Sequence, residues 1–170
     1  MKKVIVVSAV LAFAACASGA AAAYAPARAW HFVPRVGYFD PVATGEKGTV
    51  AAGFEVLYAL NDLHGVSLGV LYSKNDISAA GFDGKNLLLG VGVRQKLDTE
   101  LPTGTFYYGI DLSYHRKKVP AWKYKKVGGT VLLGFEWRRP WRLEAGYTFA
   151  GNDEGVKMGG LAVTVGYKIQ

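Results

Sequence analysis

Cysteine is nearly absent from this sequence. The single cysteine, Cys16, lies in an N-terminal segment that we expect to be removed, so the remaining chain has no thiol for disulfide bonds, metal thiolate sites or nucleophilic catalysis. Long apolar runs are absent after residue 23, where none approaches the roughly 20 residues that a membrane-spanning helix needs. No window has the period of an amphipathic helix. These absences exclude thiol chemistry and a helical membrane protein.

The first 23 residues have the form of a secretory signal. Two lysines at positions 2 and 3 precede an apolar run from 4 to 15, and small residues follow as far as Ala23. We predict cleavage after Ala23, and residues 24–170 suit one domain. A second interpretation remains open, in which the residues before Cys16 form a lipoprotein signal and Cys16 is acylated and retained.

The mature chain is dominated by eight stretches that alternate large apolar residues with small or polar ones. In residues 64–73, for example, positions 66, 68, 70 and 72 are apolar, whereas 65, 67, 69 and 73 are Gly or Ser. Successive side chains of a strand point to opposite faces, so this period predicts a sheet that is apolar on one face and polar on the other. The predicted strands are residues 30–39, 49–60, 64–73, 85–97, 105–115, 126–138, 141–150 and 157–169.

The connections between these strands alternate in length. A chain that begins in the periplasm and crosses a membrane eight times places its first, third, fifth and seventh connections outside, where outer-membrane barrels carry their longer loops. Those connections are mostly the longer ones, and they are predicted at residues 40–48, 74–84, 116–125 and 151–156.

Two closed barrels could use such strands. A soluble, lipocalin-like barrel would turn the apolar face inward, and a membrane barrel would turn it outward to lipid. The large side chains of the apolar face, such as Phe54, Leu89 and Val163, would crowd an eight-stranded interior. In a membrane, the reversed phase would also place Arg94 and Arg142 in hydrocarbon, at roughly 2–4 kcal/mol each. The sequence therefore predicts an all-β fold, an eight-stranded antiparallel up-and-down transmembrane β-barrel.

With this Gly-x-apolar texture and these loop lengths, residues 30–170 resemble the small eight-stranded outer-membrane barrels, the group that contains the OmpA transmembrane domain. The resemblance implies a bacterial outer-membrane protein whose partners are outer-membrane lipids, lipopolysaccharide and the barrel-assembly machinery. We expect a monomer. The chain departs from the group by ending in Gln170 instead of an aromatic residue, and by Pro34, which we expect a bulge or a later strand start to absorb.

Charged residues share the face opposite the apolar one. Buried charges survive when they are paired and hydrogen-bonded, so we predict an ion-pair network across the lumen, as is typical of the group that the chain resembles. The network acts as a plug in one interpretation and as a gate or narrow pore in the other. Its predicted members are Arg35, Glu55, Arg94, Asp111, Glu136, Arg142 and Glu144.

The predicted third outer loop is strongly basic. Lys and Arg bind phosphate, and aromatic rings settle at a membrane interface, so the loop suits anions such as lipopolysaccharide phosphates or an adhesion partner. A solvated loop without a ligand is the alternative. No nucleic-acid partner is expected. The candidate anion-binding residues are Arg116, Lys117, Lys118, Trp122, Lys123, Tyr124, Lys125 and Lys126.

Aromatic residues near the strand ends are predicted to form two membrane-interface girdles, because rings with one polar edge sit well at headgroup depth. They are Trp30, Tyr38, Tyr58, Tyr72, Tyr114, Trp137, Trp141, Tyr147 and Tyr167.

The best catalytic constellation is Asp111, Ser113 and His115, which share one face of a predicted strand. Side chains two apart on a strand stand parallel instead of converging, and the His-x-Ser-Asn motif of barrel lipid A deacylases is absent. His31 and His64 lack partners at metal-ligand spacing. We therefore expect a non-enzymatic barrel without cofactor or metal, with a structural or surface-interaction role. The alternatives are a lipid A or phospholipid acyl hydrolase and a small-solute channel.

Overall fold

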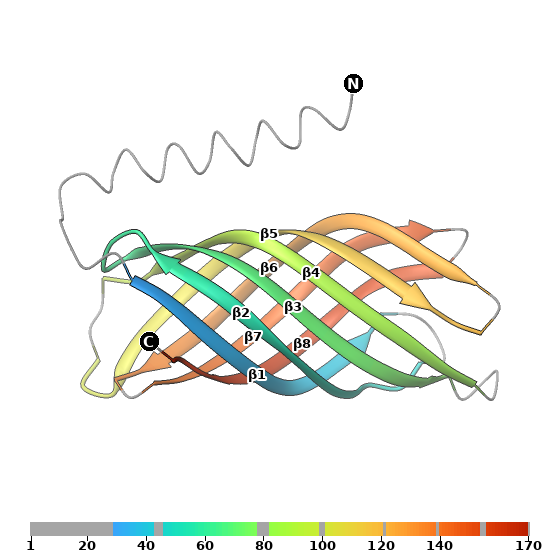
Figure 1. Ribbon diagram of the computed structural model, residues 1–170, viewed down its shortest axis with the longest axis horizontal. Helices are drawn as coiled ribbons and strands as arrows, with labels where there is room; N and C mark the ends of the chain where they lie inside the picture. Colours follow the sequence, from blue (N-terminus) through green and yellow to red (C-terminus); the bar gives the residue numbers. More distant parts are fainter. Residues whose placement is uncertain are drawn as a thin grey trace, which may run out of the picture.

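Eight antiparallel strands form the closed barrel of the computed structural model, which describes residues 29–42, 46–77, 82–98, 101–120, 122–138, 140–153 and 156–169 (Figure 1). Each strand pairs with the next in the chain, and the last closes against the first. The predicted signal and Cys16 lie outside the described residues. The strands are β1 (Ala29–Pro41), β2 (Thr49–Ala59), β3 (His64–Ile77), β4 (Phe82–Lys96), β5 (Gly104–Lys118), β6 (Lys123–Trp137), β7 (Trp141–Asp153) and β8 (Val156–Tyr167).

The apolar face of the sheet points outward, which confirms the predicted phase. Phe54 and Val163 are each 39% exposed on the wall, whereas Glu55 is 1% exposed inside the barrel. A continuous apolar wall is unfavourable in water and suits hydrocarbon. No helix in the described part of the chain is long and apolar enough to cross a membrane.

The two ends of the barrel differ. One end, called here the terminal end, holds the start of β1, the end of β8 and the turns that follow β2, β4 and β6 (Figure 1). The opposite end, called the loop end, holds the connections that follow β1, β3, β5 and β7.

Several strands continue further at the loop end than predicted. β3 continues to Ile77 and β4 begins at Phe82, while β5 continues to Lys118 and β6 begins at Lys123. The prediction of long connections at 74–84 and 116–125 was therefore wrong. It placed the end of each strand at its last large apolar residue. Backbone pairing between strands does not require apolar side chains, however, and it continues into the charged segments.

Pro34 is absorbed without a bulge or a later strand start, so that prediction was also wrong. It pairs with Phe54 in an unbroken β1–β2 register. Phe32, two residues earlier, exchanges backbone hydrogen bonds of 3.0 and 2.8 Å with Ile169 at the β8 side. Because alternate residues of a strand direct their N–H groups to the same side, the missing N–H of Pro34 falls at the β1–β8 seam, whose continuous register begins at Arg35.

The predicted girdle aromatics lie on the outer wall. At the terminal end, the rings of Trp30 and Tyr58 are 4.6 Å apart and those of Trp141 and Tyr167 are 5.1 Å apart. Trp137 is exposed at the same end. Toward the loop end the outward rings are Tyr38, Tyr72, Tyr114 and Tyr147.

Candidate functional site: an ionic lumen and a cationic outer surface

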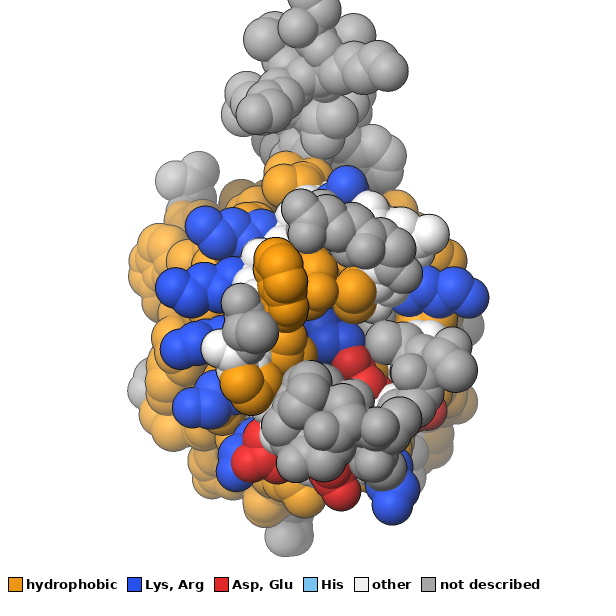
Figure 2. Space-filling model, turned by 90° about the vertical axis from the view of Figure 1, so that its right-hand side faces the viewer, with side chains coloured by type: hydrophobic (Ala, Val, Ile, Leu, Met, Phe, Trp, Pro, Cys, Tyr) orange, Lys and Arg blue, Asp and Glu red, His pale blue; other side chains and the backbone are white. Residues whose placement is uncertain are grey.

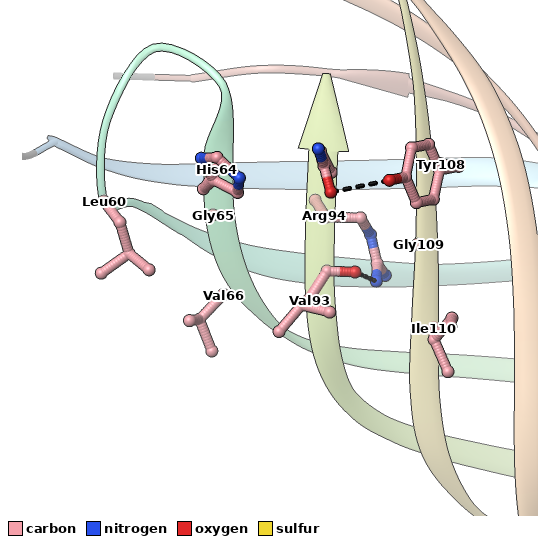
Figure 3. Close-up of a pocket in the computed structure, with 10 residues that line it drawn as sticks. Leu60, His64, Gly65, Val66, Val93, Arg94, Tyr108, Gly109 and Ile110 are labelled. Carbon is pink, nitrogen blue, oxygen red and sulfur yellow. Dashed lines mark hydrogen bonds between the residues drawn. The ribbon is translucent and has the colours of Figure 1, made fainter. Parts of the chain in front are cut away.

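Inward glycines make room for the long side chains of the lumen. A Cβ atom on Gly134 would lie 2.1 Å from the Tyr107 ring, and one on Gly109 would lie 2.9 Å from Cδ of Arg94. Figure 3 shows Arg94 on β4 with Gly65 and Gly109 beside it on β3 and β5, the positions to which the ladder pairs it. The Gly-rich inner face is therefore the space that the charged residues occupy.

Glu55 is the centre of the lumen network. Its Oε1 lies 2.8 Å from Nη2 of Arg94, and its Oε2 accepts a 2.9 Å hydrogen bond from Nη1 of Arg142. Arg94 also donates from Nη1 to Oδ1 of Asp111 at 2.5 Å. Since these residues come from β2, β4, β5 and β7, the network crosses the interior and connects opposite walls.

A second part of the network surrounds Glu144. Arg35 donates from Nη1 to its Oε1 at 3.0 Å, and the Tyr107 hydroxyl donates to its Oε2 at 3.2 Å. The guanidinium of Arg142 lies 4.6 Å from the centre of the Tyr107 ring. Sequence reasoning missed Tyr107, although its position between the outward Phe106 and Tyr108 places it on the inner face.

Glu136 binds cations nearer the terminal end. Nζ of Lys96 and Nζ of Lys168 lie 3.0 and 2.6 Å from the same Oε1 atom, and Nε of Arg142 lies 3.8 Å from Oε2. Sequence reasoning also missed both lysines, which share the inward phase of Arg94 and of Gly166. All seven predicted lumen residues thus lie in one connected network, with Tyr107, Lys96 and Lys168 added to it.

Two further layers fill the lumen toward the loop end. The first is an apolar cluster of Phe39, Ala51 and Leu71, with Leu88 and Ala162 packed against it. The second is polar, and its Ser73, Asn75, Asn86 and His115 side chains are joined by hydrogen bonds. A cavity of about 30 Å³ lies between the ionic network and the apolar cluster, and residues of both line it.

The catalytic candidates have separate partners. Asp111 binds Arg94, the Ser113 hydroxyl lies 2.6 Å from that of Thr130, and Nε2 of His115 lies 3.2 Å from Oδ1 of Asn86. The three side chains are all buried. They do not form a nucleophile, base and orienting group with one another.

The predicted anion-binding loop is divided by the fold. Arg116, Lys117 and Lys118 belong to β5, and Lys123, Tyr124, Lys125 and Lys126 belong to β6, so the prediction of a loop was wrong. Lys117 is 3% exposed and forms an ion pair with Glu46 on the inner side. The register places Tyr124 and Lys126 opposite Lys117 and His115, on that same side. Trp122, in the turn, is 62% exposed.

The remaining basic residues form a cationic surface on the outer wall, made of Lys85, Arg116, Lys118, Lys123 and Lys125. The ladders place Lys85 opposite Lys118, Lys118 opposite Lys123 and Arg116 opposite Lys125. Directly opposite residues of an antiparallel pair point to the same face. Figure 2, which faces the loop end, shows Lys and Arg side chains projecting from its rim.

Comparison with known proteins relates the fold to solved structures. No family model matches the chain, and no curated protein matches it. The crystal structure of Neisserial surface protein A is 21% identical, covers 82% of this chain and 97% of its own, and has a TM-score of 0.63. The outer membrane protein OprG from Pseudomonas aeruginosa is 14% identical over 84% of this chain and 97% of its own, with a TM-score of 0.56.

The chain has the fold of the small outer-membrane β-barrels. Another such barrel is Ail, the attachment invasion locus protein of Yersinia pestis, whose crystal structure holds the heparin analogue sucrose octasulfate. Ail is 13% identical over 82% of this chain and 97% of its own, with a TM-score of 0.50.

The barrel has its cations in two different environments. The arginines of the lumen are buried and matched by carboxylates, whereas the outward positions of β5 and β6, both fully described, carry no Asp or Glu. Lys74, opposite Lys85 on β3, does form an ion pair with Asp83. The lumen arginines are thus matched by carboxylates, whereas the outward faces of β5 and β6 carry positive charge without negative charge.

Proposed function

We propose that this protein is a non-enzymatic barrel with a closed lumen, and that its cationic surface binds phosphate groups of lipopolysaccharide in the bacterial outer membrane. The observation that carries the proposal is the register of the cations. Like charges directly opposite each other on neighbouring strands destabilise a sheet. Lys85 stands opposite Lys118, and Lys118 stands opposite Lys123, across β4, β5 and β6, and an anionic ligand would convert their repulsion into binding.

The position of the cationic surface favours a lipid ligand. A chain that begins in the periplasm and crosses the membrane eight times places the connections after β1, β3, β5 and β7 outside, so the loop end of this barrel would lie outside the cell. One step toward the terminal end, the ladder places Tyr72 opposite Leu87 and Leu89 opposite Tyr114. The cations therefore lie just beyond the apolar wall, at the depth where lipid headgroups carry their phosphates.

The experiment replaces Arg116, Lys118, Lys123 and Lys125 together by Gln. We expect lipopolysaccharide to bind the purified variant at least about tenfold more weakly than the native barrel, and the native affinity to fall as salt rises. Lys47→Gln with Lys157→Gln, two exposed lysines at the same end, is the control and should bind normally. Equal affinity of the fourfold variant and the control would reject the proposal.

A soluble sulfated polymer is a second candidate ligand for the same surface. It is favoured by the sucrose octasulfate in the Ail structure and by the exposed Trp122 beside the cations, since rings and cations together suit sugars with anionic groups. Heparin fragments and lipopolysaccharide, titrated in parallel into the native barrel, distinguish the two ligands by their affinities.

Absence of catalysis is part of the proposal, because the candidate residues bind other side chains and lie inside the barrel. Purified barrel is expected to release no fatty acid from phospholipid or lipid A. Ester cleavage that is lost in Ser113→Ala or His115→Ala would overturn this part of the proposal.

A further inference from the structure

The terminal end of the lumen opens into a vestibule that is distinct from the cationic surface. It is a cavity of about 420 Å³, within the range of about 300–1,000 Å³ that small-molecule sites occupy. Its lining includes His31 on β1, Lys96 on β4, Glu136 on β6 and Lys168 after β8, and Arg94 and Arg142 of the ionic network line it as well. The vestibule is therefore a concave and polar site.

Positive charge exceeds negative charge in the deep part of this vestibule. Two ammonium groups, those of Lys96 and Lys168, share a single oxygen of Glu136, and Arg142 approaches its other oxygen. Arg94 and Arg142 are already matched by Glu55 and by the other carboxylates of the network. One carboxylate thus serves two lysines, and an unmatched positive charge remains.

Three residues that line the vestibule have nitrogen atoms without a hydrogen-bond partner in the part of the chain that the structure describes. His31 is 8% exposed, and its Nδ1 atom has no hydrogen-bond partner among the described residues. The Nε atoms of Arg94 and Arg142 are likewise buried without one. His31 is also within electrostatic range of Lys168, Lys96 and Glu136. A buried polar group without a partner costs about 1–3 kcal/mol, so a ligand that forms hydrogen bonds with these nitrogen atoms stabilises the site.

We propose that the vestibule binds a small oxyanion, a phosphate or carboxylate group, on Lys96, Lys168 and His31. Lysine ammonium groups and an imidazole N–H are the donors that such oxygens accept. Two further acids, Asp62 and Asp98, line the mouth of the cavity and are exposed. Because both are exposed, water and salt screen their charges more strongly than those of the buried groups.

The experiment titrates inorganic phosphate, and separately acetate, into the full mature barrel in detergent micelles without other buffer anions. Backbone amide shifts in NMR spectra report where each anion binds. We expect saturable shifts at residues 31, 96 and 168, with a dissociation constant at or below about 10 mM. The Lys96→Met, Lys168→Met variant should bind at least about tenfold more weakly, and Lys157→Met at the loop end should bind as the native barrel does.

Three results would each overturn the proposal. They are the absence of saturable shifts in the native barrel, an affinity of the double variant equal to that of the native barrel, and shifts confined to the loop end. If the double variant loses heat-modifiable migration on a gel, Lys96→Gln replaces it, because Lys168 still pairs with Glu136 in that variant. Failure of lipopolysaccharide binding leaves this result unaffected, since the two sites share no residue.

Discussion

Glu55 offers the sharpest test of the closed ionic lumen. It is 1% exposed and contacts two arginines at 2.8 and 2.9 Å. Glu55→Gln keeps the shape of the side chain and removes its charge. Arg94 retains Asp111, but the only carboxylates that remain near Arg142 are Glu136 and Glu144, at 3.8 Å. One buried guanidinium is left without a close partner.

Removal of one partner of a buried ion pair costs about 3–5 kcal/mol. Because Arg94 stays paired, we expect Glu55→Gln to lower the free energy of unfolding by about 3 kcal/mol, near the lower limit of that range. Arg142→Gln added to Glu55→Gln should cost less than the sum of the single changes, with a coupling energy of about 1–3 kcal/mol. Urea unfolding in lipid vesicles, followed by tryptophan fluorescence, measures these differences.

The exposed ion pair between Lys74 and Asp83 is the matched control, since its side chains are 56% and 52% exposed. Exposed pairs contribute little, so Asp83→Asn should leave the urea midpoint unchanged. The reasoning is refuted if Glu55→Gln unfolds at the same urea concentration as Asp83→Asn, or if the Glu55 and Arg142 changes are additive.

Two further predictions concern the packing and closure of the lumen. Gly134→Ala should destabilise the barrel strongly, because its Cβ would lie 2.1 Å from the Tyr107 ring. Gly129→Ala should not, because its Cβ would have only one neighbour, at 3.7 Å. Heat-modifiable migration after refolding measures both variants, and equal effects would contradict the close contact. In planar bilayers the native barrel, Arg142→Ala and Phe39→Ala should each be silent, because in each of them at least two of the three layers still fill the lumen. Conductance of the Arg142→Ala variant alone would show that the ionic layer is the sole barrier.

The direction of nearly every strand side chain could be predicted from the sequence. Arg35, Glu55 and Glu144 were placed on the inner face because side chains alternate along a strand and large apolar residues occupy the opposite phase. The closed barrel followed, since no other arrangement of eight such strands separates the charges from the apolar residues so completely. Phe54 and Val163, exposed on the wall, agree with that assignment.

Strand ends and ladder neighbours could not be predicted in the same way. The basic residues between 116 and 126 were assigned to a loop because apolar residues stop there, but backbone pairing continues to Lys118 and resumes at Lys123. Only the register reveals that Lys85 of β4 stands beside Lys118 and that Lys117 turns inward to Glu46.

The sequence alone determined which face of the barrel each side chain occupies, because alternation is a local property of an extended chain. The tertiary structure decided which charges meet, since Arg142 binds Glu55 across 87 positions of sequence. Such a contact depends on the tilt and stagger of strands around a closed barrel, and only the complete set of eight ladders fixes that stagger.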